Sequence, residues 1–182
     1  MADMPAKKLL ARPVKDAPSV TPEGRPLGRR IAGLSITALA PVEDERGDVT
    51  ELYRTSWKLH PAPVTQVYRA MLRPGVVKGW ILHRKQEDRL AVIEGTLTWA
   101  FYDDRPGSRT RGVLSVLTFS ERSRTLVVIP RGVWHAVKNV GLTDAAFINM
   151  PSRAYDHADP DKYRLPLKND LIPFDFSRPL RG

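Results

Sequence analysis

The sequence of 182 residues contains no cysteine, which excludes disulfide bonds and any metal site built on thiolates. This absence is typical of a protein from a reducing compartment, and we expect a cytoplasmic location. The sequence also lacks an apolar run close to the roughly 18 residues of a membrane span, and its first residues lack the apolar segment of a signal peptide. No membrane partner is therefore expected.

Acidic residues are fewer than basic ones, 20 against 29, and the net charge is +9. Such a balance permits an anionic partner, either a phosphorylated small molecule or a nucleic acid. The cations are scattered, and no series of aromatic residues lies among them, so a nucleic-acid partner is not expected. Residues 1–30, which hold five prolines and many charges, predict a flexible basic arm that precedes one domain at 31–182.

Helical periodicity is also scarce, and from residue 31 the sequence consists of short apolar runs separated by turns rich in Gly and Pro. About ten such runs at near-regular spacing predict an all-β sandwich or closed barrel with few short helices. The central pair of strands is expected at 76–82 and 90–94, joined as a hairpin, with a companion pair in 129–139. The end of the chain, 156–182, is expected to wrap the surface.

Four motifs follow one another along the chain. They are D-x-R-G-x-x-x-E at 44–51, G-V-V-K-G at 75–79, D-x-R-x-x-S-x-T-x-G at 103–112 and I-P-x-G-x-x-H at 129–135. In this order and spacing they resemble the dTDP-4-dehydrorhamnose 3,5-epimerases, a family of sugar-nucleotide epimerases. The resemblance implies a cupin, or jelly-roll, barrel that uses no cofactor and acts on a dTDP-linked 4-keto-6-deoxyhexose.

The resemblance also implies a nucleotide site and a homodimer. Arg46 and Lys78 would neutralise the diphosphate, and Lys78 stands where the family has an arginine. Glu51 and Gln66 would hydrogen-bond the nucleotide. In the family's dimer an N-terminal strand pairs with the partner's sheet, and we expect residues 34–40 to do so here.

Three positions at which the family carries catalytic residues hold other side chains. Ile81 stands in place of the histidine base, and Asp88 in place of a lysine. Asn149 stands in place of the tyrosine acid, where it can bind substrate but cannot act as an acid near pH 7. The family's ordinary reaction is therefore in question for this chain.

Other residues can take over the catalytic roles. His83 lies two residues after Ile81, on the same face of the expected strand, and is a candidate base. His135 and Asp170 match positions where the family pairs a histidine with a carboxylate, and they would support the base. Tyr155 is a candidate acid, and it could instead stack on the nucleotide base.

A second pattern is general to cupins and indicates metal binding. The segment P-x-G-x-x-H-x-x-x-N is complete at 130–139, and the preceding cupin motif is partly present at 81–95. His83, Asp88 and His135 would then form a set of two histidines and one carboxylate that suits Fe(II), Mn(II) or Zn(II).

Three functions are therefore open at the level of the sequence. The first is an epimerase-like enzyme, with the family's stereochemical outcome or an altered one. The second is a non-catalytic protein that binds nucleotide sugars, and the third is a metal-dependent cupin enzyme. Two further histidines, His60 and His157, are expected at the surface.

Overall fold

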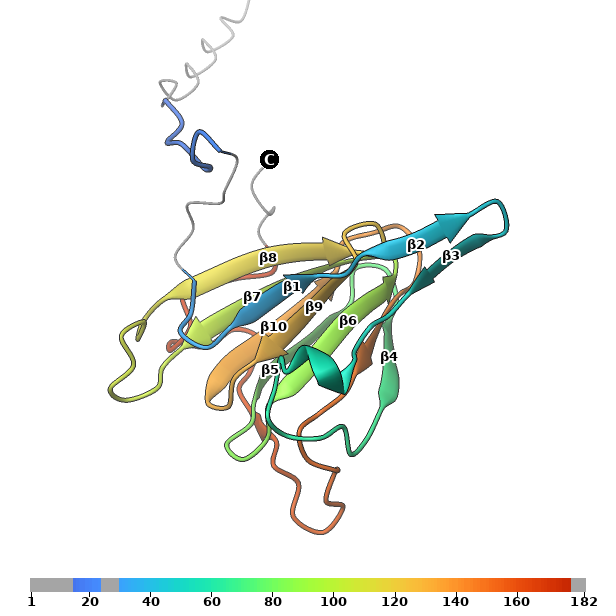
Figure 1. Cartoon of the computed structure of the whole chain (residues 1–182). Coiled ribbons are helices and arrows are strands. Elements are labelled where there is room, and N and C mark those ends of the chain that lie inside the picture. Colours follow the sequence, from blue (N-terminus) through green and yellow to red (C-terminus); the bar gives the residue numbers. More distant parts are fainter. Residues whose placement is uncertain (1–14, 24–29, 178–182) are drawn as a thin grey trace, which may run out of the picture.

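The computed structural model describes residues 15–23 and 30–177, and these consist mostly of β-strands and the loops between them (Figure 1). Two five-stranded antiparallel sheets face each other, with strand orders β1-β9-β6-β11-β4 and β12-β5-β10-β7-β8. The described residues contain one short 3-10 helix, η1 (Thr55–Trp57), and no helix long and apolar enough to cross a membrane. The predicted all-β jelly-roll fold is confirmed, whereas most of the expected arm at 1–30 lies outside the described residues.

The strands are short, as the spacing of the turns predicts. The first sheet contains β1 (Ser35–Ala38), β9 (Thr125–Ile129), β6 (Asp88–Glu94), β11 (Ala145–Asn149) and β4 (Tyr68–Leu72). The second contains β12 (Tyr163–Arg164), β5 (Val77–Leu82), β10 (Val133–Asn139), β7 (Thr96–Asp103) and β8 (Leu114–Ser120). A separate hairpin of β2 (Pro41–Asp44) and β3 (Gly47–Thr50) projects from the body (Figure 1).

The central pair of strands does not form the expected hairpin. β5 pairs with β10 and β12, whereas β6 pairs with β9 and β11, so residues 83–87 cross from one sheet to the other. β9 and β10 likewise lie in different sheets. The reason is burial: residues 88–92 of β6 are buried one after another, which requires cover on both faces of the strand. The two crossings bring polar residues from both sheets together.

Strand β1 lies at the edge of the first sheet. It pairs with β9 of its own chain, in a register that runs from Ser35 opposite Val128 to Ala38 opposite Thr125. Ile31, just before this strand, is buried in the core between the sheets and so anchors the strand in its own chain. Among the described residues β1 is an edge strand paired on one side, so the expected pairing of 34–40 with a partner's sheet and the homodimer both stay predictions.

Apolar side chains fill the interior and cover the outer faces of both sheets. Between the sheets, Trp99 meets Phe147 edge to face with ring centroids 5.1 Å apart. On the outside of the second sheet, Phe176 from the C-terminal segment packs on Trp80, which is fully buried. Residues 52–64 cover the first sheet in the same way. This cover explains why strands in both sheets are buried on both faces.

The third motif forms a structural turn around the buried carboxylate of Asp103, at the end of β7. Its oxygens accept hydrogen bonds of 2.6–2.8 Å from the side chains of Arg105, Ser108 and Thr110. Burial alone would raise the pKa of this carboxyl, but the bonds hold the pKa of Asp103 well below its usual range. Arg105 also donates to the carbonyl of Ala32, which fixes the turn to the start of the domain.

Candidate functional site

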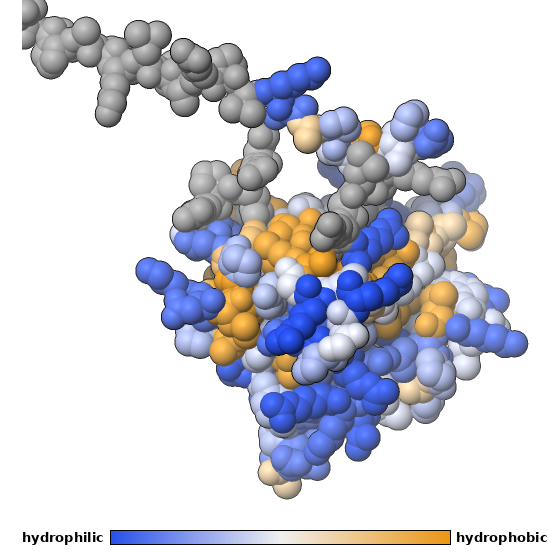
Figure 2. Space-filling view, turned by 90° about the vertical axis from the view of Figure 1, so that its left-hand side faces the viewer, coloured by the Kyte–Doolittle hydropathy of each residue, from blue (hydrophilic) through white to orange (hydrophobic). Residues whose placement is uncertain are grey.

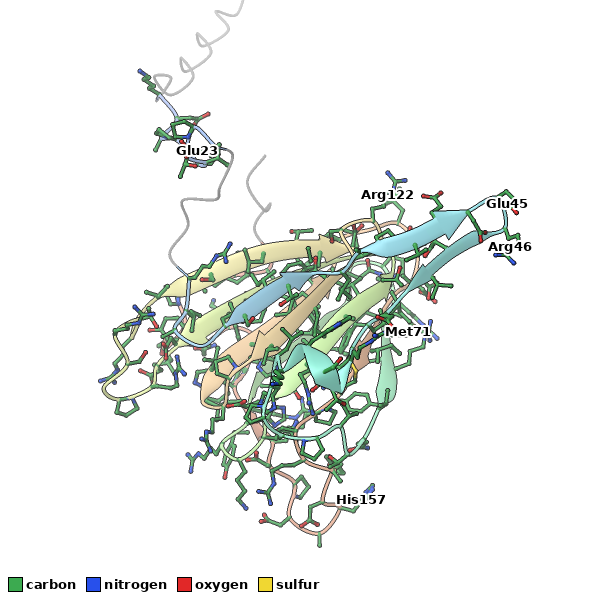
Figure 3. The ribbon with its side chains drawn as sticks, in the orientation of Figure 1. Glu23, Glu45, Arg46, Met71, Arg122 and His157 are labelled. Atoms are coloured by element: carbon green, nitrogen blue, oxygen red, sulfur yellow. The ribbon has the colours of Figure 1, made fainter. Side chains whose placement is uncertain are left out.

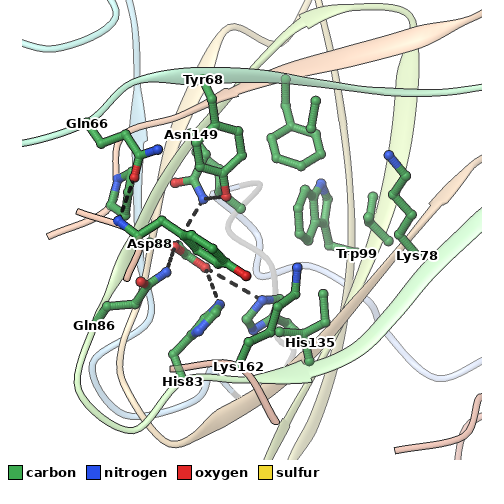
Figure 4. A pocket seen from close by; sticks show the side chains of 17 residues that line it. Gln66, Tyr68, Lys78, His83, Gln86, Asp88, Trp99, His135, Asn149 and Lys162 are labelled. Atoms are coloured by element: carbon green, nitrogen blue, oxygen red, sulfur yellow. Dashed lines mark hydrogen bonds and ion pairs between the residues drawn. The ribbon is translucent and has the colours of Figure 1, made fainter. Parts of the chain in front are cut away.

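An open pocket of about 280 Å³ lies between the two sheets, with side chains from both around it (Figure 4). Its size is close to the lower end of the range of small-molecule sites. Apolar side chains, among them Leu90, Trp99 and Phe147, form part of its wall, and polar groups form the rest. Seven of the residues that the sequence predicted for the site line this pocket: Gln66, Lys78, His83, Asp88, His135, Asn149 and Tyr155.

The polar part of the pocket is centred on Asp88, the first residue of β6, which is 3% exposed. One oxygen, Oδ1, accepts hydrogen bonds from Gln86 Nε2 at 2.9 Å and from Asn149 Nδ2 at 3.0 Å. The other oxygen, Oδ2, lies 3.4 Å from Nε2 of His83 and 3.6 Å from Nε2 of His135 (Figure 4). One carboxylate thus joins residues of both sheets into a polar cluster.

The two imidazole rings lie close together, with centroids 5.6 Å apart. Nδ1 of His83 faces the backbone carbonyl of Asp161, and Nδ1 of His135 lies 3.2 Å from the carbonyl of Val133. Burial lowers the pKa of His135 to about 4, although the charge of Asp88 acts in the opposite direction. His135 is therefore neutral near pH 7 and presents a lone pair.

A tyrosine that the sequence analysis missed lies beside the asparagine at the family's acid position. Tyr68 on β4 is directly opposite Asn149 on β11, and Asn149 Nδ2 donates to the Tyr68 hydroxyl at 2.7 Å. Burial and the charge of Asp88 raise the pKa of Tyr68, so the hydroxyl keeps its proton near neutral pH. Strand alternation could have revealed it, because Tyr68 lies two residues after Gln66 in the same apolar run.

Two lysines give the pocket positive charge. Lys78 on β5 donates from Nζ to the carbonyl of Met71 at 2.8 Å. Lys162 enters from the irregular segment before β12, where no sequence pattern pointed to it. Partial burial and the charge of Arg164 lower the pKa of Lys162. The two amines suit a ligand that carries negative charge.

Three predicted site residues lie away from the pocket. Arg46 is at the tip of the β2–β3 hairpin (Figure 3) and Glu51 follows β3, each in an ion pair with a near neighbour. Asp170 is exposed, because its segment packs against the outer face of the second sheet. The carboxylate that faces His135 is Asp88, which corrects the expected pairing of His135 with Asp170.

Behind the pocket wall, a buried arginine ties two loops to β6. Arg89 is fully buried and donates to four backbone carbonyls, those of 62–63 and 150–151, at 2.6–2.9 Å. The neighbouring Glu87 pairs with His60, whose side chain is buried rather than at the surface as expected. This buried pair and the arginine hold the loops that frame the pocket.

Two facing sheets with a polar pocket between them define a jelly-roll protein built to hold a small molecule. The family model described as dTDP-4-dehydrorhamnose 3,5-epimerase matches residues 29–167, and the chain belongs to this family. The resemblance found in the four motifs is therefore confirmed.

The chain is similar to a probable epimerase of glycan biosynthesis and to solved structures of a dTDP sugar isomerase and an epimerase. The probable low-salt glycan biosynthesis epimerase Agl13 of Haloferax volcanii is 34% identical over 140 residues, which are 76% of this chain and 90% of that protein. A dTDP sugar isomerase from Desulfovibrio desulfuricans has a solved structure with a TM-score of 0.75 and 25% identity, covering 81% of this chain and 92% of that one. The dTDP-6-deoxy-D-glucose-3,5-epimerase RmlC of Legionella pneumophila, solved in complex with dTDP-4-keto-L-rhamnose, shares the fold with a TM-score of 0.68 and 20% identity, covering 76% and 75% of the two chains.

Proposed function

We propose that this chain binds a dTDP-linked 4-keto-6-deoxyhexose in the pocket and moves protons on the carbons next to the C4 carbonyl. Such a reaction needs a base, an acid, and a donor or cation for the enolate oxygen. The observation that carries the proposal is that one pocket holds two mostly buried imidazoles, a tyrosine hydroxyl hydrogen-bonded to Asn149, and an amine. The candidates are His83 and His135 as bases, Tyr68 and Tyr155 as acids, and Lys162 as the cation.

Asp88 and Asn149 position the reacting groups in this proposal. Asp88 faces both imidazoles and would stabilise whichever ring takes up the proton. Asn149 donates to Asp88 and Tyr68, and its Oδ1 is buried with no hydrogen-bond partner among the described residues. That oxygen can accept a hydrogen bond from a sugar hydroxyl, which gives Asn149 a role in substrate binding.

The nucleotide would extend along the pocket, with Gln66 and Tyr155 at one end and Lys78 at the other (Figure 4). Lys78 supplies positive charge for the diphosphate. Gln66 Oε1 accepts a hydrogen bond of 2.8 Å from the backbone N–H of Tyr155, which fixes the two residues side by side. Their amide and aromatic ring suit the edge and the face of a base.

We also propose that the protein is a cytoplasmic homodimer that uses the β2–β3 hairpin. Val42 and Val49 are opposite each other on this hairpin and are 75% and 70% exposed, which is typical of a surface that another chain covers. If a second copy packed on this hairpin, the Arg46 and Glu51 of one chain would approach the pocket of the other chain. Apolar side chains are also exposed on the side of the body away from the hairpin (Figure 2).

Incubation with the 4-keto sugar nucleotide in deuterated water tests the proton transfer. We expect deuterium at C3 or C5, detected by mass spectrometry and NMR, and a rate at least about 100-fold lower for His83→Asn, because general-base catalysis contributes 10²–10⁴-fold. His157→Asn changes an exposed histidine outside the pocket and serves as the control. A sugar that binds but takes up no deuterium would contradict the catalytic proposal.

The second candidate function is a protein that binds the nucleotide sugar without turnover. It is favoured by Ile81, Asp88 and Asn149, which stand where the family carries its catalytic histidine, lysine and tyrosine. Calorimetry with dTDP and dTDP-glucose tests binding itself. We expect Lys78→Met to weaken binding about tenfold, through loss of one charge-assisted contact, and the exposed Lys168→Met to leave it unchanged. An absence of binding would contradict both candidate functions.

A further inference from the structure

Three potential metal ligands from the two sheets converge at the wall of the pocket. His135 lies on β10 of the second sheet, His83 directly follows β5 of the same sheet, and Asp88 begins β6 of the first. Asp88 Oδ2 lies 3.4 Å from Nε2 of His83 and 3.6 Å from Nε2 of His135, and one ligand atom of each residue lies within 4.8 Å of the others. All three residues line the open pocket.

The hydrogen bonds of the two rings determine what faces the carboxylate. Nδ1 of His83 points at the carbonyl of Asp161, and Nδ1 of His135 at the carbonyl of Val133. A carbonyl only accepts, so Nδ1 must carry the proton in both rings. A neutral imidazole then presents the lone pair of Nε2. Two lone pairs and the carboxylate of Asp88 therefore meet, and they repel one another unless positive charge lies between them.

Protons on Nε2 are a poor account of that positive charge, because they would have to form hydrogen bonds to Asp88 from these mostly buried rings, which are 12% and 8% exposed. The distances of 3.4 and 3.6 Å also exceed the 2.7–3.2 Å of an ordinary N–H···O bond. They are close to the separation of about 3.4 Å between ligands that surround an ion tetrahedrally at about 2.1 Å.

We propose that His83 Nε2, His135 Nε2 and Asp88 Oδ2 bind one divalent transition-metal ion of the class that includes Zn(II), Fe(II) and Mn(II). The remaining coordination positions of the ion open into the pocket. The surroundings of the ligands match this role. Backbone carbonyls orient both rings, and Oδ1 of Asp88 is held by Gln86 and Asn149. The same asparagine and aspartate replace two residues of the family's catalytic set.

This inference does not depend on the proposed function, and it competes with the base roles proposed there for His83 and His135. A nitrogen lone pair that binds a metal ion cannot accept a proton at the same time, so the histidines cannot fill both roles at once. The rival for neutralising Asp88 is Lys162, which lines the same pocket. Metal binding and proton exchange can be measured separately on the same protein.

The test is metal content and metal titration of the full chain, prepared without a histidine tag and without chelator. We expect about one equivalent of transition metal per chain by mass spectrometry of the elements, and saturable binding of Zn(II) and Co(II) to chelator-treated protein by calorimetry. Co(II) should also give visible absorption bands, which report ligation directly.

Matched variants show where the ion binds. Asp88→Asn and His135→Gln should each weaken binding at least about tenfold, since even residues behind the ligands matter by 10–100-fold. Asp170→Asn and His157→Gln change exposed residues outside the cluster and should bind as the unchanged protein does. Circular dichroism and unfolding curves show whether each variant is folded, and the Co(II) bands of the unchanged chain test the site even if a variant does not fold.

The proposal is overturned if the unchanged chain binds less than about a tenth of an equivalent after exposure to Zn(II) and Co(II), or if all four variants bind equally. In the first case Lys162 is the cation that serves Asp88. Deuterium exchange without metal leaves the proposed proton transfer standing and the metal site excluded. Metal binding without deuterium exchange leaves the metal site standing and excludes the proposed proton transfer. The failure of one proposal can therefore be told from the failure of the other.

Discussion

Asp103 shows at the scale of one residue how a family motif contributes to stability rather than to chemistry. Asp103→Asn replaces a charged acceptor of several hydrogen bonds, and we expect it to lower the free energy of unfolding at pH 7 by about 2 kcal/mol. Urea unfolding measures the change. Asp104→Asn, next along the chain and more exposed, is the control and should cost less.

The stability of Asp103→Asn and that of the unchanged protein should depend differently on pH. In the unfolded chain Asp103 takes up a proton as the pH falls through about 3.8, whereas the folded carboxyl stays ionised because its pKa is lowered. The stability that this residue contributes is therefore complete above pH 5 and lost at lower pH. The difference in stability between Asp103→Asn and the unchanged protein should shrink below pH 4, and a constant difference would contradict the assignment.

Arg89 is a second residue whose role is structural. Arg89→Met fits the space but leaves the carbonyls of 62–63 and 150–151 without their donor. We expect a loss of about 3 kcal/mol in the free energy of unfolding. Arg73→Met, at an exposed position, should change it by less than about 0.5 kcal/mol. Equal effects of the two substitutions would show that the buried bonds contribute nothing.

Only part of the site could be predicted from single residues in the sequence. His83 was found because strand alternation places it on the face of Ile81, and both line the pocket. Lys162 could not be found, because it comes from an irregular segment where no period fixes the direction of a side chain. Asp170 was assigned by alignment alone, and such a match cannot show that its segment packs on the outer face of the sheet.

At the scale of an element, the β2–β3 hairpin carries the prediction about assembly. We expect the unchanged protein to have twice the mass of one chain in light scattering. Val42→Lys with Val49→Lys places two charges on the exposed surface of the hairpin and should yield the mass of one chain. Leu142→Lys, at a loop position that is 96% exposed, is the control. A dimer that survives both hairpin substitutions would contradict this interface.

Strand positions were predicted well because turns and apolar runs are local signals. β5 (Val77–Leu82) and β6 (Asp88–Glu94) end where the sequence predicted, at 82 and 94, and begin within two residues of the predicted starts. Which strands pair was not predicted correctly, because pairing depends on burial on both faces and not on distance along the chain. The crossing at 83–87, taken as a hairpin turn, is the clearest case.

At the scale of the whole molecule, the C-terminal segment closes the outer face of the second sheet. Ile172 is 2% exposed in the cluster around Trp80, and Ile172→Ala should lower the free energy of unfolding by about 3 kcal/mol, through the cavity it leaves. Leu171→Ala, one residue earlier and 40% exposed, should cost less than about 1 kcal/mol. Urea unfolding followed by tryptophan fluorescence compares them, and similar losses would argue against a packed segment.

The crossing between the sheets has a consequence for how the molecule fluctuates. Because Asp88 begins a strand of one sheet, while His135 lies on a strand of the other and His83 directly follows one, a ligand bound by all three resists separation of the sheets. Amide hydrogens at the facing ends of β5 and β6 should then exchange with solvent more slowly, and to a similar degree, when the cluster is occupied. Binding at the cluster and slower opening of the barrel should therefore occur together, the first measured by ligand titration and the second by hydrogen exchange.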